Sequence, residues 1–488
     1  MEEFKIPSFQ SGINQYSAEG LIKPYEAIDA KNCNIETGSL KSFRKSVQYK
    51  TNNEDVPIHS LIPYYGSSNR LFYVSANKIK NVSNNDLLYT FDTDGANRVD
   101  SLNFEYNGKN VVIVTNGKDT PVMFDGSKWT KLKNRRPVYN DEGNKTGYVD
   151  ANGNECANES SVQTYAPKGK FVELHYDRLW IAGDPSNPNR VYFSTNGVNG
   201  ADIQDWTVPL ADEEEINMHG GFLDVRSYDG SKIIGMKVVM NYITIFKEKS
   251  VWKVYGSSQE NYQMIQVFSC DGAISDRSIC VGNNGLFYLN KDGIYFFDGT
   301  NNTIISKPIQ TTINNMNSSY ATNSVGIYEK GKYYLAIPTG TSETNNTLIM
   351  YDTYTKAFML YDISGIDDIK EFNDIIYYVS GKYIYRLGKG SDSLPMVWLT
   401  PKYDFGHKNT RKITDRIYFR GKGNGKVRFT LSSEKSSKTL EIELTPTEQL
   451  YRKRLKCKGR MLQLKIENIN NSNIEIIAPS VSCELDED

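Results

Sequence analysis

The 488-residue sequence is poor in the residue types that build redox, metal and histidine-based sites. It has six cysteines and four histidines. No cysteines form a C-x-x-C pair and no histidines have H-x-x-x-H spacing, so neither a disulfide framework nor a zinc site is indicated. We therefore expect a protein without metal or cofactor, made in a reducing cytoplasm. The cysteines are Cys33, Cys156, Cys270, Cys280, Cys457 and Cys483.

Long apolar runs are also missing. No window approaches the roughly 18 apolar residues of a membrane-spanning helix. The opening residues, MEEFKIPSFQ, start with acids and have no apolar stretch, unlike a secretory signal peptide. The chain has 57 basic and 58 acidic residues and a net charge of −1. This lack of basic excess argues against a protein that coats nucleic acid.

Motifs of common enzyme classes are absent. There is no G-x-S-x-G nucleophile elbow, and the stretch GKGNGKV has neither the spacing of a P-loop nor a Ser or Thr after its lysine. A propeller sialidase would repeat Ser-x-Asp-x-Gly-x-x-Trp turns. The single similar stretch here, FSTNGVNGADIQDW, has Asn196 in place of the Asp. We therefore predict that the protein is not an enzyme and has no catalytic residues.

Short strand-like runs, separated by Gly, Ser and Asn, fill most of the chain. Aromatic residues make up 12% of it, with 33 tyrosines, a composition that favours strands. The runs group into blocks of about 30–45 residues, the length of a four-stranded propeller blade. This predicts an all-β fold with a six- or seven-bladed β-propeller. The blocks are residues 60–91, 101–133, 171–206, 232–267, 276–306, 323–362 and 369–388.

The stretch HYDRLWIAGD, residues 175–184, combines residue types that are common in active sites. Its position favours another interpretation, because turns of different chemistry take the same place in other blocks. These turns are residues 66–70, 107–110, 240–242 and 329–332. We therefore predict a hairpin between the first two strands of a blade, with Trp180 and Ile181 in the core, Asp177 capping the turn and Arg178 paired or solvated.

A second type of turn begins with Asp after an apolar strand. It occurs at Phe124-Asp125-Gly126, Phe297-Asp298-Gly299 and Tyr351-Asp352, and it predicts the outer hairpin of a blade. One helix is expected, at residues 306–319, where apolar residues recur at i, i+4 and i+7 after Pro308. Residues 134–169 are polar and rich in Gly and Asn, and we interpret them as a hairpin inserted between the second and third blades.

The length and spacing of the strand-like runs change at about residue 395. Longer alternating strands, such as RKITDRIYFRG and GKVRFTLSSE, predict a C-terminal β-sandwich, with RGKGNGKV as a glycine-rich hairpin turn. The expected domains are residues 1–55, an N-terminal segment that joins this β-platform, residues 56–394, the propeller, and residues 395–488, the sandwich.

The expected sandwich is basic. Residues 400–461 contain 17 Lys and Arg against 6 Asp and Glu, while ADEEE, residues 211–215, is an acidic focus elsewhere. Regions of opposite charge suit self-association or docking to a charged partner. The candidate assembly or lumen-facing residues are Arg411, Lys412, Arg452, Lys453, Arg454, Lys456, Lys458 and Arg460.

Residues 9–46 contain a distinctive set of positions, namely Gly12, Ile13, Asn14, Glu26, Ala27, Ala30, Asn32, Gly38 and Leu40. With these residues the stretch resembles the opening of the tail hub or nozzle proteins of short-tailed bacteriophages, also called phage stabilisation proteins. The segments YDRLWIAG and LTPKYDFG resemble the middle blades and the closing β-domain of that family. The inserted residues 134–169 depart from the family pattern.

The resemblance implies a structural virion protein that forms a homo-hexameric ring below the portal and its adaptor ring, as a head-tail connector. Its β-domain and N-terminal segment would build a tube through which double-stranded DNA is retained and ejected, and tail fibre or tip proteins would be further partners. Two alternatives stay open. One is a glycan- or receptor-binding tail propeller, and the other is a glycan-cleaving propeller enzyme.

Overall fold

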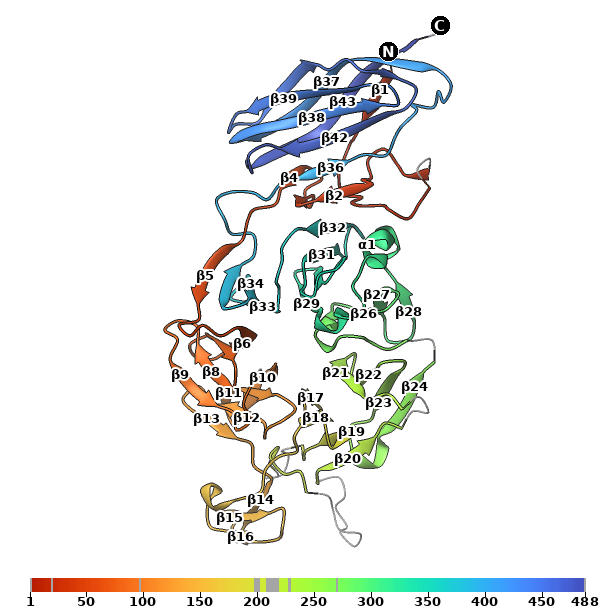
Figure 1. The fold of residues 1–488 in the computed structure, drawn as a ribbon. Helices are drawn as coiled ribbons and strands as arrows, with labels where there is room; N and C mark the ends of the chain where they lie inside the picture. Colours follow the sequence, from red (N-terminus) through yellow and green to blue (C-terminus); the bar gives the residue numbers. More distant parts are fainter. Residues whose placement is uncertain are drawn as a thin grey trace. The chain divides into compact units, whose positions relative to one another are not determined.

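A computed structural model of the chain describes residues 2–18, 21–95, 98–196, 202–207, 219–226, 230–268 and 271–486. Strands dominate these residues (Figure 1). The chain divides into two compact units. Unit 1 consists of Met1–Tyr49, Ile304–Ile366 and Tyr385–Asp488, and unit 2 consists of Lys50–Thr303 and Asp367–Ile384.

Unit 2 is built from consecutive four-stranded antiparallel sheets (Figure 1). Each of the first five sheets takes four successive strands of the chain. The first two sheets are β6 (Ile58–Tyr64), β7 (Arg70–Ser75), β8 (Lys78–Asn81) and β9 (Leu87–Thr90), then β10 (Asp100–Tyr106), β11 (Lys109–Thr115), β12 (Val122–Phe124) and β13 (Trp129–Lys131). The third sheet is β17 (Phe171–His175), β18 (Arg178–Asp184), β19 (Asn187–Phe193) and β20 (Gly221–Asp224).

The fourth sheet is β21 (Ile233–Val239), β22 (Tyr242–Lys247), β23 (Val251–Tyr255) and β24 (Gln263–Val267), and the fifth is β25 (Cys280–Gly282), β26 (Gly285–Asn290), β27 (Gly293–Phe297) and β28 (Asn302–Ile304). A further sheet orders β33 (Asp368–Phe372), β34 (Ile375–Ser380), β35 (Tyr383–Arg386) and β5 (Val47–Thr51). The chain passes between the units within β5 and β35.

Buried side chains fill the spaces between successive sheets of unit 2. Separate apolar cores join the first sheet to the second, the second to the third and the third to the fourth. The sheet formed by β33, β34, β35 and β5 packs against the first sheet of unit 2. Tyr377 and Val379 of β34 share an apolar core with Ile58 and Leu61 of β6. Sheets that pack face to face and return to the first sheet define a β-propeller.

Two-residue turns join the first two strands of most of these sheets. Both turn residues have positive φ, which is the type I′ geometry that matches the twist of a hairpin. Asn or Gly occupies many of these positions because these residues tolerate that conformation. The turns are Asn107-Gly108, Tyr176-Asp177, Met240-Asn241 and Asn373-Asp374 in unit 2, and Lys330-Gly331 in unit 1.

The hairpin predicted for HYDRLWIAGD is confirmed. His175 pairs with Arg178 across the turn, and Trp180 and Ile181 are fully buried. Of the two environments predicted for Arg178, paired or solvated, the structure excludes the solvated one, because the side chain is fully buried. Its Nη1 donates hydrogen bonds to the carbonyl oxygens of Ser194 and His219, at 2.8 and 2.9 Å.

The turns that begin with Asp are also confirmed as hairpins between the third and fourth strands. The Asp125 carboxylate accepts hydrogen bonds from the backbone amides of Ser127 and Lys128, both at 2.9 Å. Burial alone would raise the pKa of Asp125, but these hydrogen bonds outweigh it and lower the pKa to about 2. Asp298 and Asp352 accept equivalent backbone hydrogen bonds in their own turns.

Unit 1 contains two packed sheets that form a β-sandwich. The first sheet orders β3 (Cys33–Asn34), β4 (Leu40–Ser42), β43 (Ile474–Asp486), β37 (Arg411–Gly423) and β40 (Gln449–Arg454), with β1 (Glu2–Lys5) on β43 and β41 (Lys458–Gly459) on β37. The second orders β29 (Val325–Glu329), β30 (Lys332–Ile337), β31 (Thr347–Asp352), β32 (Phe358–Tyr361), β2 (Asp29–Lys31), β36 (Val397–Leu399), β42 (Leu462–Asn468), β38 (Gly425–Ser433) and β39 (Ser437–Leu444).

The N-terminal segment completes the sandwich, as predicted. Phe4 of β1 pairs with Val481 of β43, and its buried ring packs against Tyr403 and Phe405 at centroid distances of 5.5 and 5.7 Å. Phe419 of β37 packs against Phe429 of β38, with ring centroids 4.8 Å apart, and this contact joins the two sheets. The all-β class, with a propeller and a β-sandwich that includes the N-terminal segment, is therefore confirmed. The described residues form seven blade-like, four-stranded groups, one of them β29–β32 in unit 1.

The stretch RGKGNGKV is not a hairpin turn, contrary to the prediction. It carries the chain from β37 in one sheet of the sandwich to β38 in the other. Its glycines are required by close packing against residues 472–474. A Cβ on Gly423 would lie 2.5 Å from the Asn473 carbonyl oxygen, and one on Gly425 would lie 2.3 Å from Cβ of Ser472.

Two other segments differ from simple blade strands. The expected helix is shorter than predicted, comprising a 3-10 turn at Lys307–Ile309 and α1 at Gln310–Asn314. Beyond the helix, the backbone N–H of Asn317 donates a hydrogen bond to the carbonyl oxygen of Pro338, at 3.0 Å, and not to a carbonyl of the preceding helical turn. The inserted segment forms its own sheet between the second and third sheets of unit 2, as predicted. Its strands are β14 (Arg135–Tyr139), β15 (Lys145–Asp150) and β16 (Glu155–Cys156).

The boundaries of the two compact units differ from those of the three domains expected from the sequence. Residues 304–366 group with the N-terminal and C-terminal segments rather than with the other blades. The reason lies in unit 1 itself, where β32 pairs in parallel with β2 through Leu360 and Lys31. This pairing extends the second sheet of the sandwich into the four strands β29–β32.

Candidate assembly surface

Most of the basic residues singled out from the sequence lie along one edge of the sandwich. β40 and β41 both pair with β37, and among the described residues they pair with no other strand. Arg411 lies on β37 and is half-buried. The exposed members of the set, which we call the basic edge, are Arg452, Lys453, Arg454, Lys456, Lys458 and Arg460.

Lys412 does not belong to this exposed surface. Its side chain is fully buried, and its Nζ donates hydrogen bonds to the carbonyl oxygens of Arg460, at 2.8 Å, and His407. Burial of an ammonium group costs free energy, and these hydrogen bonds offset part of that cost. The prediction that Lys412 faces a partner or a lumen is therefore corrected.

Few acids neutralise the basic edge. The carboxylate of Asp415 forms ion pairs with Nε of Arg416, at 3.3 Å, and with Nε of Arg454, at 3.8 Å. These two arginines lie opposite each other on β37 and β40, so they share one acid. Asp486 pairs with Lys458 at 2.5 Å. Leu450, whose side chain is exposed, lies on β40. In the described part of the chain, this edge therefore combines positive charge with a strand that pairs on one side only.

The opposite edge of the same sheet is formed by β1. Cys483 of β43 has Glu2 of β1 on one side and Thr414 of β37 on the other, so β43 and β37 separate β1 from β40. The sequence of β1 is EEFK, whereas that of β40 is QLYRKR. The sheet thus ends in β1 on one side and in the basic strand β40 on the other.

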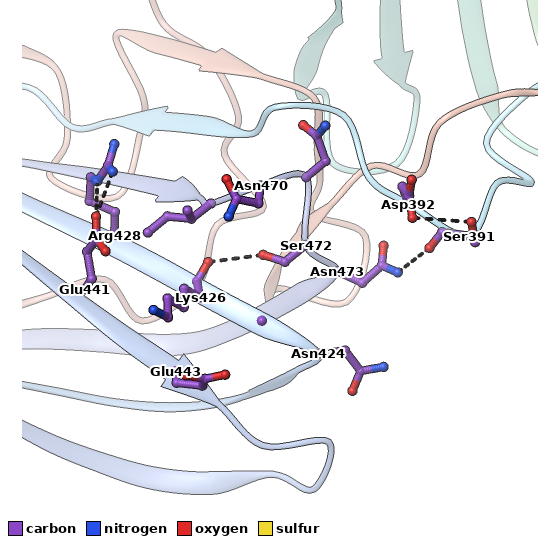
Figure 2. Close-up of a pocket in the computed structure, with 13 residues that line it drawn as sticks. Ser391, Asp392, Asn424, Lys426, Arg428, Glu441, Glu443, Asn470, Ser472 and Asn473 are labelled. Carbon is purple, nitrogen blue, oxygen red and sulfur yellow. Dashed lines mark hydrogen bonds and ion pairs between the residues drawn. The ribbon is translucent and has the colours of Figure 1, made fainter.

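A polar pocket of about 650 Å³ lies at the corner of the sandwich where the chain crosses between sheets (Figure 2). Its side chains largely bond to the surrounding chain. Asn473 donates to the Ser391 carbonyl oxygen at 2.5 Å, and Arg428 pairs with Glu441 at 2.7 Å. The lining has no aromatic, histidine or cysteine side chain. We interpret this pocket as a hydrated structural corner.

The described residues contain no cluster of three or more His, Cys, Asp or Glu arranged to hold a metal ion. No helix in the described part of the chain is long and apolar enough to cross a membrane. The acidic stretch at residues 211–215 lies outside the described residues, as does Cys270.

Sequence reasoning missed that residues 449–454 form a strand. Tyr451 is the one buried residue of β40, and it stacks on Phe419 at 5.0 Å. A strand with a single buried side chain has no alternating pattern to reveal it. The isolated tyrosine within a basic run was the available signal.

The fold and this surface together describe a β-propeller protein with an added β-sandwich. No family model matches the chain, and no curated protein matches its sequence. Among solved structures it is similar to virginiamycin B lyase from Staphylococcus aureus, with 11% identity, a TM-score of 0.41 and coverage of 70% of this chain and 98% of that one.

Two further solved structures are similar to this chain. The Neurospora crassa Pan2 WD40 domain has 8% identity and a TM-score of 0.36, with coverage of 71% and 95% of the two chains. PorZ, a surface component of the type-IX secretion system of Porphyromonas gingivalis, has 11% identity and a TM-score of 0.27, with coverage of 72% and 52%. Similarities this low do not indicate what the present chain does.

Proposed function

We propose that this protein is a structural component of a virion, a tail hub or nozzle subunit that assembles into a ring of identical copies. Its partners in this proposal are the portal-adaptor ring and tail fibre or tip proteins. Double-stranded DNA passes through the ring without being held. The proposal requires no catalysis.

The observation that supports the proposal best is the construction of the sandwich from both ends of the chain. The N-terminal stretch that resembles the tail hub family, residues 9–46, supplies β2 to β4. β2 pairs with β32 and β36, and β4 pairs with β43. The resemblance implies a β-domain built in this way. The composite sheets give the subunit a platform, one sheet of which continues into the blade-like strands β29–β32.

The two edges of the first sandwich sheet suit a head-to-tail ring. An open strand edge readily pairs with another chain, and an interface between two different surfaces of identical subunits generates a ring when the rotation closes. β40 of one copy would lie beside β1 of the next. The positive charge of β40 disfavours contact between two copies of this same edge.

The charge of the subunit also fits a channel for DNA. A channel lined by a strong basic excess would retain the genome, because each phosphate contact adds to salt-dependent affinity. The net charge of −1 avoids a general attraction. In the proposed ring the basic edge is used between subunits, which removes it from the path of DNA.

Assembly of the purified chain tests the proposal. We expect rings by mass photometry and negative-stain electron microscopy. The triple variant Arg452→Glu, Lys453→Glu, Arg454→Glu should lose them, because it reverses the charge of β40, the strand proposed to lie at the subunit interface. A matched control changes Lys389, Lys408 and Lys435, which are exposed and lie off β40, to Glu. The control alters net charge equally and should assemble normally.

Two results would reject the proposal. One is a chain that stays monomeric at high concentration and never co-assembles with portal or adaptor proteins. The other is equal assembly of the β40 variant and its control, which would exclude the basic edge as the subunit interface.

A further inference from the structure

The inserted sheet forms one wall of a second pocket, of about 780 Å³, within unit 2. The other wall is the outer part of the second four-stranded sheet, with Met123 of β12 and Thr130 of β13. Tyr106 lies at the hairpin between β10 and β11. The inserted sheet lies between β13 and β17 in the sequence, and unlike the neighbouring sheets it has three strands rather than four. Pockets of this volume are typical of small-molecule sites.

A fixed cation lies at the base of this pocket. The Arg135 side chain is 4% exposed and pairs with Glu159 at 3.0 Å and with Asp202. Tyr106 donates a hydrogen bond to the same Asp202 at 2.7 Å. These contacts use both carboxylate oxygens of Asp202 and one, Oε1, of Glu159. They also join the inserted sheet to residues that follow the third blade's strand β19.

In the pocket lining, lysines outnumber the acids that could still neutralise them. Lys128, Lys133 and Lys145 line the pocket, and none of them has a carboxylate of a described residue within ion-pair distance. Lys133 donates to the Val162 carbonyl oxygen and Lys145 to the Tyr148 hydroxyl, both at 2.6 Å. Each ammonium group has three donors, so each retains hydrogens for a ligand. The third acid of the lining, Asp125, is held by its own turn.

Tyrosine rings keep these cations close to the pocket. Lys133 lies 4.4 Å from the ring centre of Tyr165, and Arg135 and Lys145 lie 4.3 and 4.6 Å from that of Tyr148. Cation–π contacts of this kind hold positive charge over a ring without neutralising it. Tyr165 remains 39% exposed.

We propose that this pocket binds an acidic saccharide, with carboxylate or phosphate groups on Lys128, Lys133 and Lys145 and the sugar ring beside Tyr165. The amide and hydroxyl groups of Asn107, Thr130, Ser160 and Gln204 line the same space, and they match the hydroxyls of a sugar. This function goes beyond the proposed assembly role and involves a different unit of the chain.

Single-stranded nucleic acid is the main competing ligand, since it also binds to basic and aromatic surfaces. The structure favours a saccharide for two reasons. Such strands need an extended groove with bare rings for stacking, whereas here cations lie over Tyr148 and Tyr165. The polar groups in the lining would have no role in sequence-independent stacking.

Isothermal titration calorimetry on the full chain tests this proposal. The probes are a hyaluronan tetrasaccharide, a glycerol-phosphate teichoic acid fragment, neutral chitotetraose, inorganic phosphate and oligo(dT). We expect one or both acidic saccharides to bind, more weakly as salt rises, and the two together distinguish carboxylate from phosphate sources. Binding of neither acidic saccharide would overturn the proposal, as would equal binding of chitotetraose or of phosphate alone. Preferential binding of oligo(dT) would show a nucleic-acid site instead.

Variants assign the binding to this pocket. Lys128→Glu with Lys145→Glu replaces two exposed side chains of the lining and should weaken binding by about tenfold or more. The matched control, Lys168→Glu with Lys249→Glu, changes exposed lysines elsewhere in unit 2 and should bind normally. Equal loss in both variants would reject the assignment. Ring assembly measured on the same samples separates this result from the assembly proposal, because neither variant touches the basic edge.

Discussion

The blades and the sandwich use the same strand pairing over very different distances in the sequence. In the third blade, His175 pairs with Arg178 across a two-residue turn. In the sandwich, Phe4 pairs with Val481, near the other end of the chain. A blade hairpin closes a short loop at small entropic cost, whereas pairing of the two termini must wait until most of the chain is ordered. The sandwich should therefore be more sensitive than a blade to the loss of a single contact between distant residues.

The largest effect is expected from Trp180→Ala in the blade core. Trp180 is fully buried and packs against Phe193 and Tyr262 at 5.0 and 5.2 Å. Removing it leaves a cavity that should cost about 3–5 kcal/mol in the free energy of unfolding. Denaturant titration followed by circular dichroism measures this loss. Tyr176→Ala, at the exposed turn of the same hairpin, should cost less than about 1 kcal/mol, and equal losses would contradict the core assignment.

Phe4→Ala should destabilise the sandwich by about 3 kcal/mol, through loss of the buried aromatic contact with Tyr403 and Phe405. Because β1 is held mainly by pairing with β43, we expect amide hydrogen exchange to increase along Ile474–Asp486. Exchange in β17 and β18 should stay unchanged. Faster exchange throughout both units would show instead that they unfold together.

Asp125→Ala should cost about 1 kcal/mol at neutral pH, since it removes the acceptor that closes an outer blade turn. The pKa of this carboxyl falls from the ordinary 3.8 to about 2 in the folded chain. Its stabilisation is thus complete above about pH 4 and is lost as the pH falls through about 2. Melting temperatures of the variant and the parent should converge over that interval. Asp125→Asn keeps an acceptor and should lose the pH dependence alone.

His175→Ala should have the smallest effect. The centre of its imidazole lies 4.3 Å from the centre of the Tyr176 ring, and its buried Nε2 has no hydrogen-bond partner among the described residues. Burial lowers the pKa of His175 below 6.5, so the folded chain resists protonation and loses stability as the pH falls below that value. The variant should assemble normally and lose this part of the acid sensitivity. A selective loss of assembly or saccharide binding with the fold intact would give the residue a functional role.

Local signals made the blades predictable from the sequence. The turn at Tyr176-Asp177 and the Asp-led turns at Asp125 and Asp298 follow from short-range rules, because the residues that form each turn are neighbours in the chain. The same rules failed at RGKGNGKV. A glycine-rich stretch fits both a hairpin and a crossing between sheets, and the contact of Gly425 with Ser472 decides between them.

The candidate sites were less predictable than the fold. The basic run at residues 451–460 was visible in the sequence, but its position on an edge strand depends on pairing with β37. Lys412 belongs to the same charge pattern and is buried. No sequence signal joined Lys128, Lys133 and Lys145 into one pocket, because the inserted sheet brings them together only after it folds against the blade.

The sequence by itself determined the all-β class, the repeated blades, the hairpins within them and the basic character of the C-terminal part. These features depend on residues within a few positions of one another. The tertiary structure alone decided the pairing of the two termini, the edge position of β40, the burial of Arg178 and Lys412, and the pocket beside the inserted sheet. Each of these depends on which distant strands pack together, and composition and periodicity do not contain that information.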